Sequence, residues 1–160
     1  MITVEQYLTG EGKSIVKEIQ DNLASTRTDA TGKTSKSLKS LVDSVIGKIT
    51  LVVKGRGFFK VVETGRGPRK STSRSDFFNN FLEWMSVRGV GNELDARKRM
   101  GLARFLIWKI NKEGSALFKK GGRKDIFSNV ITEGRIQKIR EHIKSLYKDA
   151  IVKSLTQAVQ

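Results

Sequence analysis

The 160-residue chain contains no cysteine, one proline (Pro68) and one histidine (His142). Without cysteine there are no disulfide bonds, no thiolate chemistry and no cysteine-ligated metal, which suits a reducing compartment. With one histidine, neither a typical zinc site nor a Cys–His pair can form within the chain, and no serine motif points to a triad. The low proline content and 29% charged residues favour a helix-rich fold.

The chain also lacks an apolar run of the ~18 residues that a membrane span needs, and its N-terminus lacks a basic region followed by an apolar stretch. We therefore expect a soluble protein with no membrane partner and no cleaved signal. A length of 160 residues predicts one domain across residues 1–160, large enough for a hydrophobic core.

Positive charge is abundant but unevenly distributed, with a net charge of +15. Residues 1–47 have a net charge of zero, 75–96 of −3 and 125–160 of +2. The excess lies in 48–74, with eight basic residues against one acid, and in 97–124, with ten against one. Such segregation favours a phosphate polyanion or an acidic protein as partner. The alternative is a basic protein whose charge merely keeps it dispersed.

Apolar residues recur at helical spacing in four segments, and these predict amphipathic helices. Gly10 and Gly12 weaken or bend the start of the first segment, so residues 12–25 are its firmer part. The last segment is a long C-terminal helix. The four segments span about 3–25, 75–87, 93–112 and 133–157.

Apolar side chains at 49, 51 and 53 alternate with mostly polar ones at 48, 50, 52 and 54, which predicts a strand with one mostly wet face. Residues 38–46 are its expected hairpin partner, and 58–62 form either a third strand or a short helix. Residues 25–37 predict a polar loop long enough to be mobile. The fold class is therefore α+β, with a small antiparallel sheet from roughly 38–63 packed with about four amphipathic helices.

The first of two basic, glycine-containing segments runs from Glu63 to Lys70, Glu-Thr-Gly-Arg-Gly-Pro-Arg-Lys. Its glycines allow backbone geometries closed to other residues, and Pro68 stiffens the residues after it. We expect Glu63 to pair with a nearby arginine, while the cations project outward to carboxylates or phosphates. The alternative is an exposed basic turn. The predicted contact residues here are Arg66, Arg69, Lys70 and Arg74.

The second segment runs from Phe118 to Asp125, Phe-Lys-Lys-Gly-Gly-Arg-Lys-Asp. Apolar residues flank it on both sides, and Gly121-Gly122 predicts a tight reversal such as a hairpin tip. This tip either reaches into a partner or is a solvated turn anchored to the protein's own core. Its predicted contact residues are Lys119, Lys120, Arg123 and Lys124.

Few other residues suggest chemistry. Trp84 and Trp108 lie on predicted helices and indicate core or interface packing rather than base stacking. Three acids, Asp43, Glu63 and Asp76, show no pattern of a carboxylate-only magnesium site. We therefore expect no enzyme activity, no cofactor, no metal and no small-molecule substrate.

The order of short motifs along residues 12–130 is more specific than any single motif. A leading helix is followed by a polar Thr-Gly loop that runs into the hairpin, and an aromatic-led segment ending in Glu-x-Gly follows the sheet. The segments are Ala30-Thr-Gly-Lys33 with Ser37-Leu-Lys-Ser-Leu41, Phe58-Phe-Lys-Val-Val-Glu-Thr-Gly65, Trp108-Lys-Ile-Asn-Lys-Glu-Gly114 and Phe118 to Phe127.

This order resembles the head–tail connector and tail-completion (neck) proteins of tailed phages, and the two later segments are similar to neck ring proteins of crAss-like phages. Members of the common family end soon after the Glu-x-Gly turn with a Pro-Phe-Leu-Arg-Pro-like docking segment, whereas this chain adds helices and a basic turn.

The resemblance implies a non-catalytic, ring-forming virion protein assembled in the host cytoplasm. Its implied partners are copies of itself, portal-side and tail-side virion proteins, and DNA in the channel. The charge distribution favours a competing hypothesis, a basic nucleic-acid-binding protein, and a small phage nuclease is a third.

Overall fold

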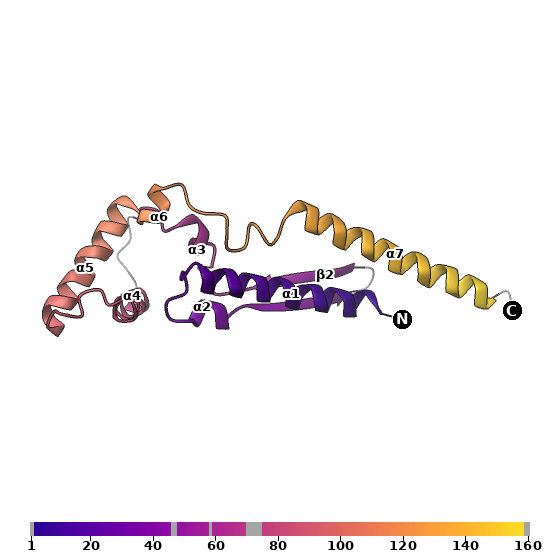
Figure 1. The fold of residues 1–160 in the computed structure, drawn as a ribbon, viewed down its shortest axis with the longest axis horizontal. Helices are drawn as coiled ribbons and strands as arrows, with labels where there is room; N and C mark the ends of the chain where they lie inside the picture. The colour runs from indigo at the N-terminus through magenta and orange to yellow at the C-terminus, as the bar shows by residue number, and fades with distance from the viewer. Residues whose placement is uncertain (1, 46–47, 58, 70–74, 159–160) are drawn as a thin grey trace.

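The computed structural model describes residues 2–45, 48–57, 59–69 and 75–158. It confirms the α+β class, with a two-stranded antiparallel sheet and helices packed along an extended body (Figure 1). Helices α4 and α5 lie at one end, α1 and the hairpin in the middle, and α7 at the other end. The elements are α1 (Val4–Ser25), α2 (Lys33–Lys36), β1 (Lys39–Val45), β2 (Lys48–Lys54), α3 (Val61–Thr64), α4 (Ser75–Val87), α5 (Ala96–Glu113), α6 (Ala116–Lys119) and α7 (Glu133–Ala158).

Helix α1 begins with a capping box, in which Thr3 and Gln6 each accept the other's backbone amide. Its buried residues recur every three or four positions and face the hairpin and the core. Gly10 and Gly12 do not interrupt it. Instead, Gly12 lies against the hairpin, where an added Cβ would stand 2.7 Å from Ser40 Cβ and 2.8 Å from Leu51 Cδ1. The glycine expected to weaken the start of α1 is therefore where this helix contacts the hairpin.

We expect opposite effects from alanine at these two glycines. Gly10→Ala meets no atom within 4 Å and should raise the free energy of unfolding by about 0.5–1 kcal/mol through helix propensity. Gly12→Ala gains the same propensity but must push α1 off the hairpin, so a net loss of about 1–2 kcal/mol is expected. Urea denaturation of both variants measures this difference. Equal effects would show that α1 and the hairpin do not pack closely at Gly12.

The hairpin pairs Lys39 with Lys54 and Val45 with Lys48, as its alternation predicts. Its inner face, which includes Leu51 and Val53, packs against α1 and the core. The possible extension of the sheet to residue 63 is wrong, because Val61–Thr64 form α3. A helical turn there places Val62 against the core and Glu63 inside the protein.

The predicted polar loop between α1 and the hairpin contains a short helix, α2. The carboxylate of Asp29 accepts hydrogen bonds from the amides of Thr34 (3.3 Å) and Ser35 (2.6 Å), which satisfies two donors of the first turn. Gly32 precedes this turn with a φ of 69°. The predicted loop is therefore confirmed for residues 26–32, whereas Lys33–Lys36 form a helical turn, and the mobility of the loop stays a prediction.

The core cluster brings residues from both ends of the sequence together. Three residues of α1, one from the start of the hairpin and two from the segment after α6 pack against each other: Ile15, Ile19, Leu23, Leu38, Ile126 and Val130. The segment after α6 thus returns to the middle of the molecule before α7 begins.

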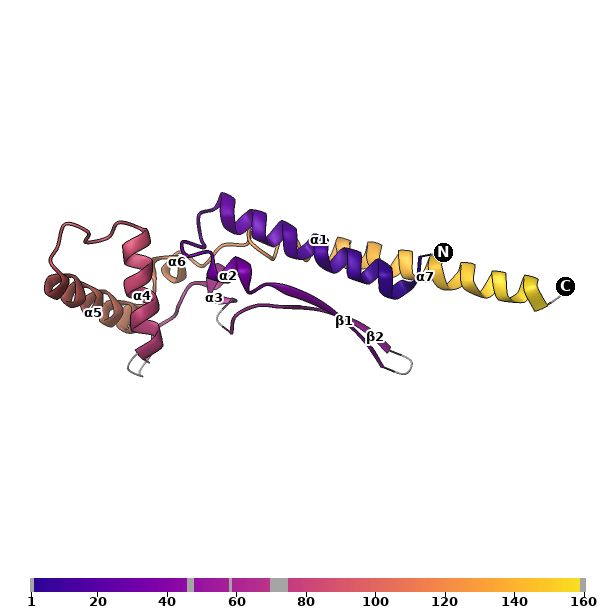
Figure 2. The same cartoon turned by 90° about the horizontal axis from the view of Figure 1, so that it is seen from below.

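The first half of α7 rests on α1. The guanidinium of Arg135 contacts the carboxylates of Glu11 and Glu18, and the rings of Tyr7 and His142 lie 4.1 Å apart. Beyond this contact α7 projects past the N-terminus of α1 (Figures 1 and 2). The sequence correctly predicts this long helix but not that its last turns lie away from the body.

Candidate functional site

The two basic glycine-containing segments, distant in sequence, lie side by side. The amide of Ser115 donates to the carbonyl oxygen of Arg66 (2.8 Å), and the amide of Arg66 donates to Ser115 Oγ (2.9 Å). The amide of Arg69 donates to the carbonyl oxygen of Asn111 (2.8 Å). We call this arrangement of residues 63–69 and 111–125 the basic junction.

Close backbone approach at the junction depends on glycine. Gly65 has a φ of 70°, and an added Cβ would stand 2.3 Å from the amide nitrogen of Phe118. Gly121 and Gly122 have φ values of 82° and 84°, and their amides donate to the carbonyls of Phe118 and Leu117. They form the turn that follows α6 and not the expected hairpin tip, because α6 precedes them where a strand was needed.

Glu63 holds the junction to the core, and it forms no ion pair with Arg66 or Arg69, the arginines of its own loop that the structure describes. Its side chain is 3% exposed. Oε1 accepts hydrogen bonds from the amides of residues 126 (2.9 Å), 127 (2.7 Å) and 128 (3.0 Å), and Oε2 accepts one from Ser128 Oγ. Its carbonyl oxygen accepts a further one from the amide of Arg123 (2.8 Å).

These hydrogen bonds favour the charged form of the carboxyl. Burial raises the pKa of Glu63, but the bonds from Ser128 Oγ and from the three amides outweigh burial, so the pKa lies below its ordinary value of 4.5. Glu63 is therefore a structural anion, and its charge is used within the fold.

Two predicted contact arginines make intramolecular contacts. The guanidinium carbon of Arg66 lies 3.6 Å from the Phe77 ring centroid, and its Nη2 donates to Asn111 Oδ1 (3.4 Å). Burial, together with the charge of Arg69, lowers the pKa of Arg66. Arg66 therefore does not project from an exposed loop as expected, and its partner role stays a prediction.

Arg123 forms a fork with Asp125, Nε to Oδ1 at 2.5 Å and Nη2 to Oδ2 at 2.6 Å. Its Nη1 donates to Thr28 Oγ1 (3.1 Å), which ties the junction to the end of α1. The hydrogen bonds that Arg123 donates to the Asp125 carboxylate, partly opposed by burial, raise the pKa of Arg123. This arginine has a structural role whether or not it also contacts a partner.

The remaining predicted cations are exposed or outside the described residues. Lys119 pairs with Glu113, and this hydrogen bond is the main reason that the pKa of Glu113 is lowered. Arg69, Lys120 and Lys124 are exposed. Lys70 and Arg74 lie outside the described residues. The junction thus offers a small number of outward cations, whose role as contacts stays a prediction.

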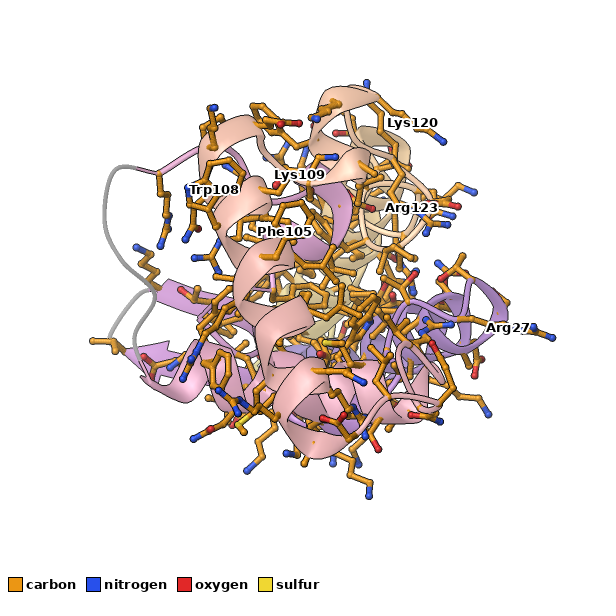
Figure 3. The ribbon with its side chains drawn as sticks, turned by 90° about the vertical axis from the view of Figure 1, so that its left-hand side faces the viewer. Arg27, Phe105, Trp108, Lys109, Lys120 and Arg123 are labelled. Carbon is orange, nitrogen blue, oxygen red and sulfur yellow. The ribbon has the colours of Figure 1, made fainter. Side chains whose placement is uncertain are left out.

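A second set of residues, on α5, was missed by the sequence reasoning. Phe105 and Trp108 are 53% and 55% exposed, so Trp108 is not a core residue, and its packing at an interface stays a prediction. Figure 3 looks onto this end of the molecule and shows both rings on α5 with Lys109 beside them. Lys120 and Arg123 of the junction are visible in the same view. The signal for this set in the sequence was the recurrence of basic and aromatic residues at helical spacing along α5.

Comparison of the chain with protein-family profiles, curated proteins and solved structures gives no match. Among the described residues, no group of three or more histidine, cysteine or acidic side chains is placed to hold a metal ion. No helix within those residues combines the length and apolar character that crossing a membrane requires.

Proposed function

We propose that the chain is a structural subunit of a tailed-phage virion neck, a head–tail connector or tail-completion protein that forms rings between the portal side and the tail. The phage assignment rests on the motif order in residues 12–130. The assembly role rests on a separate physical observation, which is the amount of surface that the isolated chain exposes.

The chain exposes more surface than a compact monomer of its size. Its accessible surface is 11346 Å² for a mass of 17.9 kDa, whereas a compact protein of that mass exposes about 8,000 Å². The excess of about 3,300 Å² is larger than the roughly 1,000–2,500 Å² that one partner contributes to an obligate interface. Partners in an assembly would bury this exposed surface. An extended subunit of this kind therefore suits a ring-forming virion protein.

Part of this excess is apolar and lies on the free end of α7. Tyr147, Ile151 and Leu155 recur every four residues and are 50%, 58% and 63% exposed. They are in register with the row of isoleucines that continues toward the part of α7 resting on α1. A helix face of this kind needs a partner, and a neighbouring copy of the chain supplies one in a ring.

Mass spectrometry of virions purified from the phage that encodes the chain tests the proposal. We expect the protein in the particle at a fixed, low copy number, cross-linked to portal-side or tail-side proteins. Its absence from purified particles would end the neck proposal, whatever the protein binds in isolation.

The α7 face gives a direct prediction. Ile151→Asp with Leu155→Asp should weaken self-association by at least about 100-fold, because each buried aliphatic side chain contributes about 1.5–3 kcal/mol. Light scattering on the full chain over a concentration series measures this. Ser145→Asp with Thr156→Asp is the matched control, since it adds the same charge at exposed positions off this row. A wild-type protein that stays monomeric, or equal effects in both variants, would show that this face does not join copies.

A further inference from the structure

The side of α5 that faces away from the core has an unusual composition. Buried Ala103 and Ile107 define the inner side of the helix, and positions on the opposite side carry only cations, rings and one glycine. We call this surface the α5 outer face. Its members, all exposed, are Arg97, Lys98, Gly101, Arg104, Phe105, Trp108, Lys109 and Lys112.

Among the described residues, few acids lie close to the cations of this face, and Glu113 at the end of α5 is the one that interacts electrostatically with Lys109 and Lys112. No acid occurs from residue 97 to residue 112. At the helix ends, Asp95 pairs with Lys98 (3.3 Å) and Glu113 pairs with Lys119. The other four cations, Arg97, Arg104, Lys109 and Lys112, form no ion pair with any described residue.

The two rings lie among these cations as a small platform. The Phe105 and Trp108 centroids are 6.1 Å apart, and the ring planes are inclined by only 28°. Lys112 Nζ lies 5.0 Å from the Trp108 ring centroid, so a cation accompanies the platform. Both rings are more than half exposed. Nothing in the described fold requires two large aromatic side chains in this position.

Charge decides between the available occupants. A second copy docking through the same face would bring the two sets of cations together, which opposes association. An acidic protein would satisfy the cations but has no particular need for a pair of near-parallel rings. A nucleic acid satisfies both, because its phosphates match the cations and its bases stack on aromatic rings.

We propose that the α5 outer face binds single-stranded nucleic acid, with phosphates on its cations and unpaired bases stacked on Phe105 and Trp108. A single strand is favoured over a duplex because bases inside a duplex offer no free ring face to Phe105 or Trp108. The site goes beyond the neck proposal and does not depend on it, since it would operate in a monomer and in an assembly.

Fluorescence anisotropy of a labelled oligothymidylate of about 20 nucleotides tests the site, with a duplex of equal length as the second probe. The variants are Phe105→Ala with Trp108→Ala, and Lys109→Ala with Lys112→Ala. Two controls remove equal charge from exposed positions elsewhere: Lys138→Ala with Lys144→Ala on α7, and Lys120→Ala with Lys124→Ala at the basic junction.

We expect the wild type to bind the single strand more tightly than the duplex. Loss of both rings should weaken single-strand binding at least about tenfold and leave duplex binding nearly unchanged. Loss of Lys109 and Lys112 should make the slope of log affinity against log salt shallower by about 1.4, twice the ~0.7 per phosphate of single strands. The two control variants should each have smaller effects.

Three results would overturn the proposal: no binding of the single strand at low salt, tighter binding of the duplex with no effect of the rings, or equal losses in the α7 control. A larger loss in the Lys120 and Lys124 variant would move the site to the basic junction. Circular dichroism checks that the ring variant is folded.

A second measurement does not rely on removing the rings. In a Trp84→Phe background, Trp108 is the sole tryptophan, and oligothymidylate should quench its fluorescence if bases stack on it. Binding without quenching would mean that the oligonucleotide binds through electrostatic contacts only. It would refute base stacking on Trp108.

Discussion

Glu63→Ala is expected to lower the free energy of unfolding by about 3–5 kcal/mol, because it leaves three backbone amides of residues 126–128 without their acceptor. Glu63→Gln keeps one acceptor oxygen and should cost less, about 1–3 kcal/mol. Urea denaturation at neutral pH measures both. Glu113→Gln, which removes an exposed carboxylate paired with Lys119, is the control and should leave the midpoint close to that of the wild type.

The same carboxylate makes stability depend on pH in a known direction. The pKa of Glu63 is lower in the folded protein than its ordinary value of 4.5. The stabilisation that the Glu63 carboxylate gives the folded protein is therefore fully present above about pH 4.5. It is lost as the pH falls through the pKa that Glu63 has in the folded state. The wild type should lose more stability between pH 5 and pH 3 than Glu63→Gln does. Parallel pH profiles for the two proteins would contradict the buried-anion role of Glu63.

The long elements could be predicted because their signals are local. The apolar spacing predicted helices at 75–87, about 93–112 and about 133–157, and the structure has them at Ser75–Val87, Ala96–Glu113 and Glu133–Ala158. The short helices α2 and α6 were missed, and α3 overlaps a segment for which a short helix was one of two alternatives. A four-residue helix cannot sustain itself by local propensity, so it forms only where tertiary contacts such as those of Asp29 or Ser115 hold it.

The candidate site was predictable only in part, for the same reason. The basic glycine segments are visible in the sequence, but their contact with each other depends on hydrogen bonds between residues 49 positions apart. Glu63 was assigned to a neighbouring arginine because nearby charges are all that a sequence displays. Its true partners are backbone amides 63 to 65 positions away, which carry no sequence signal.

The α5 outer face shows the opposite case. The spacing of its cations and rings is visible in the sequence, but the side of the helix that faces solvent is not. Cations and rings recur at helical spacing from Arg97 to Lys112. Whether Trp108 points to the core or to solvent depends on which side of α5 packs against the fold, and Ala103 and Ile107 take the inner side. The neck proposal and the nucleic-acid site therefore use opposite ends of the molecule, α7 and α5 (Figure 1).

Gly65→Ala is expected to separate the two halves of the basic junction and to lower the free energy of unfolding by at least about 3 kcal/mol. A φ of 70° with a ψ of 171° is a conformation nearly restricted to glycine and alone costs other residues about 1–3 kcal/mol. In addition, the new Cβ would stand 2.3 Å from the backbone nitrogen of Phe118, and backbone cannot move aside as a flexible side chain can. Gly57→Ala, with no atom within 4 Å and no positive φ, is the matched control.

The measurement combines urea denaturation with hydrogen exchange of the amides that join the junction. In Gly65→Ala the amides of Arg66, Arg69 and Ser115 should exchange faster than in the wild type, because their acceptors lie across the separated interface. Gly57→Ala should leave them protected. The aromatic platform lies on α5, outside this interface, so single-strand binding should survive wherever α5 stays folded. Unchanged protection in Gly65→Ala would mean that the junction tolerates a side chain there and that its close approach is not required by the fold.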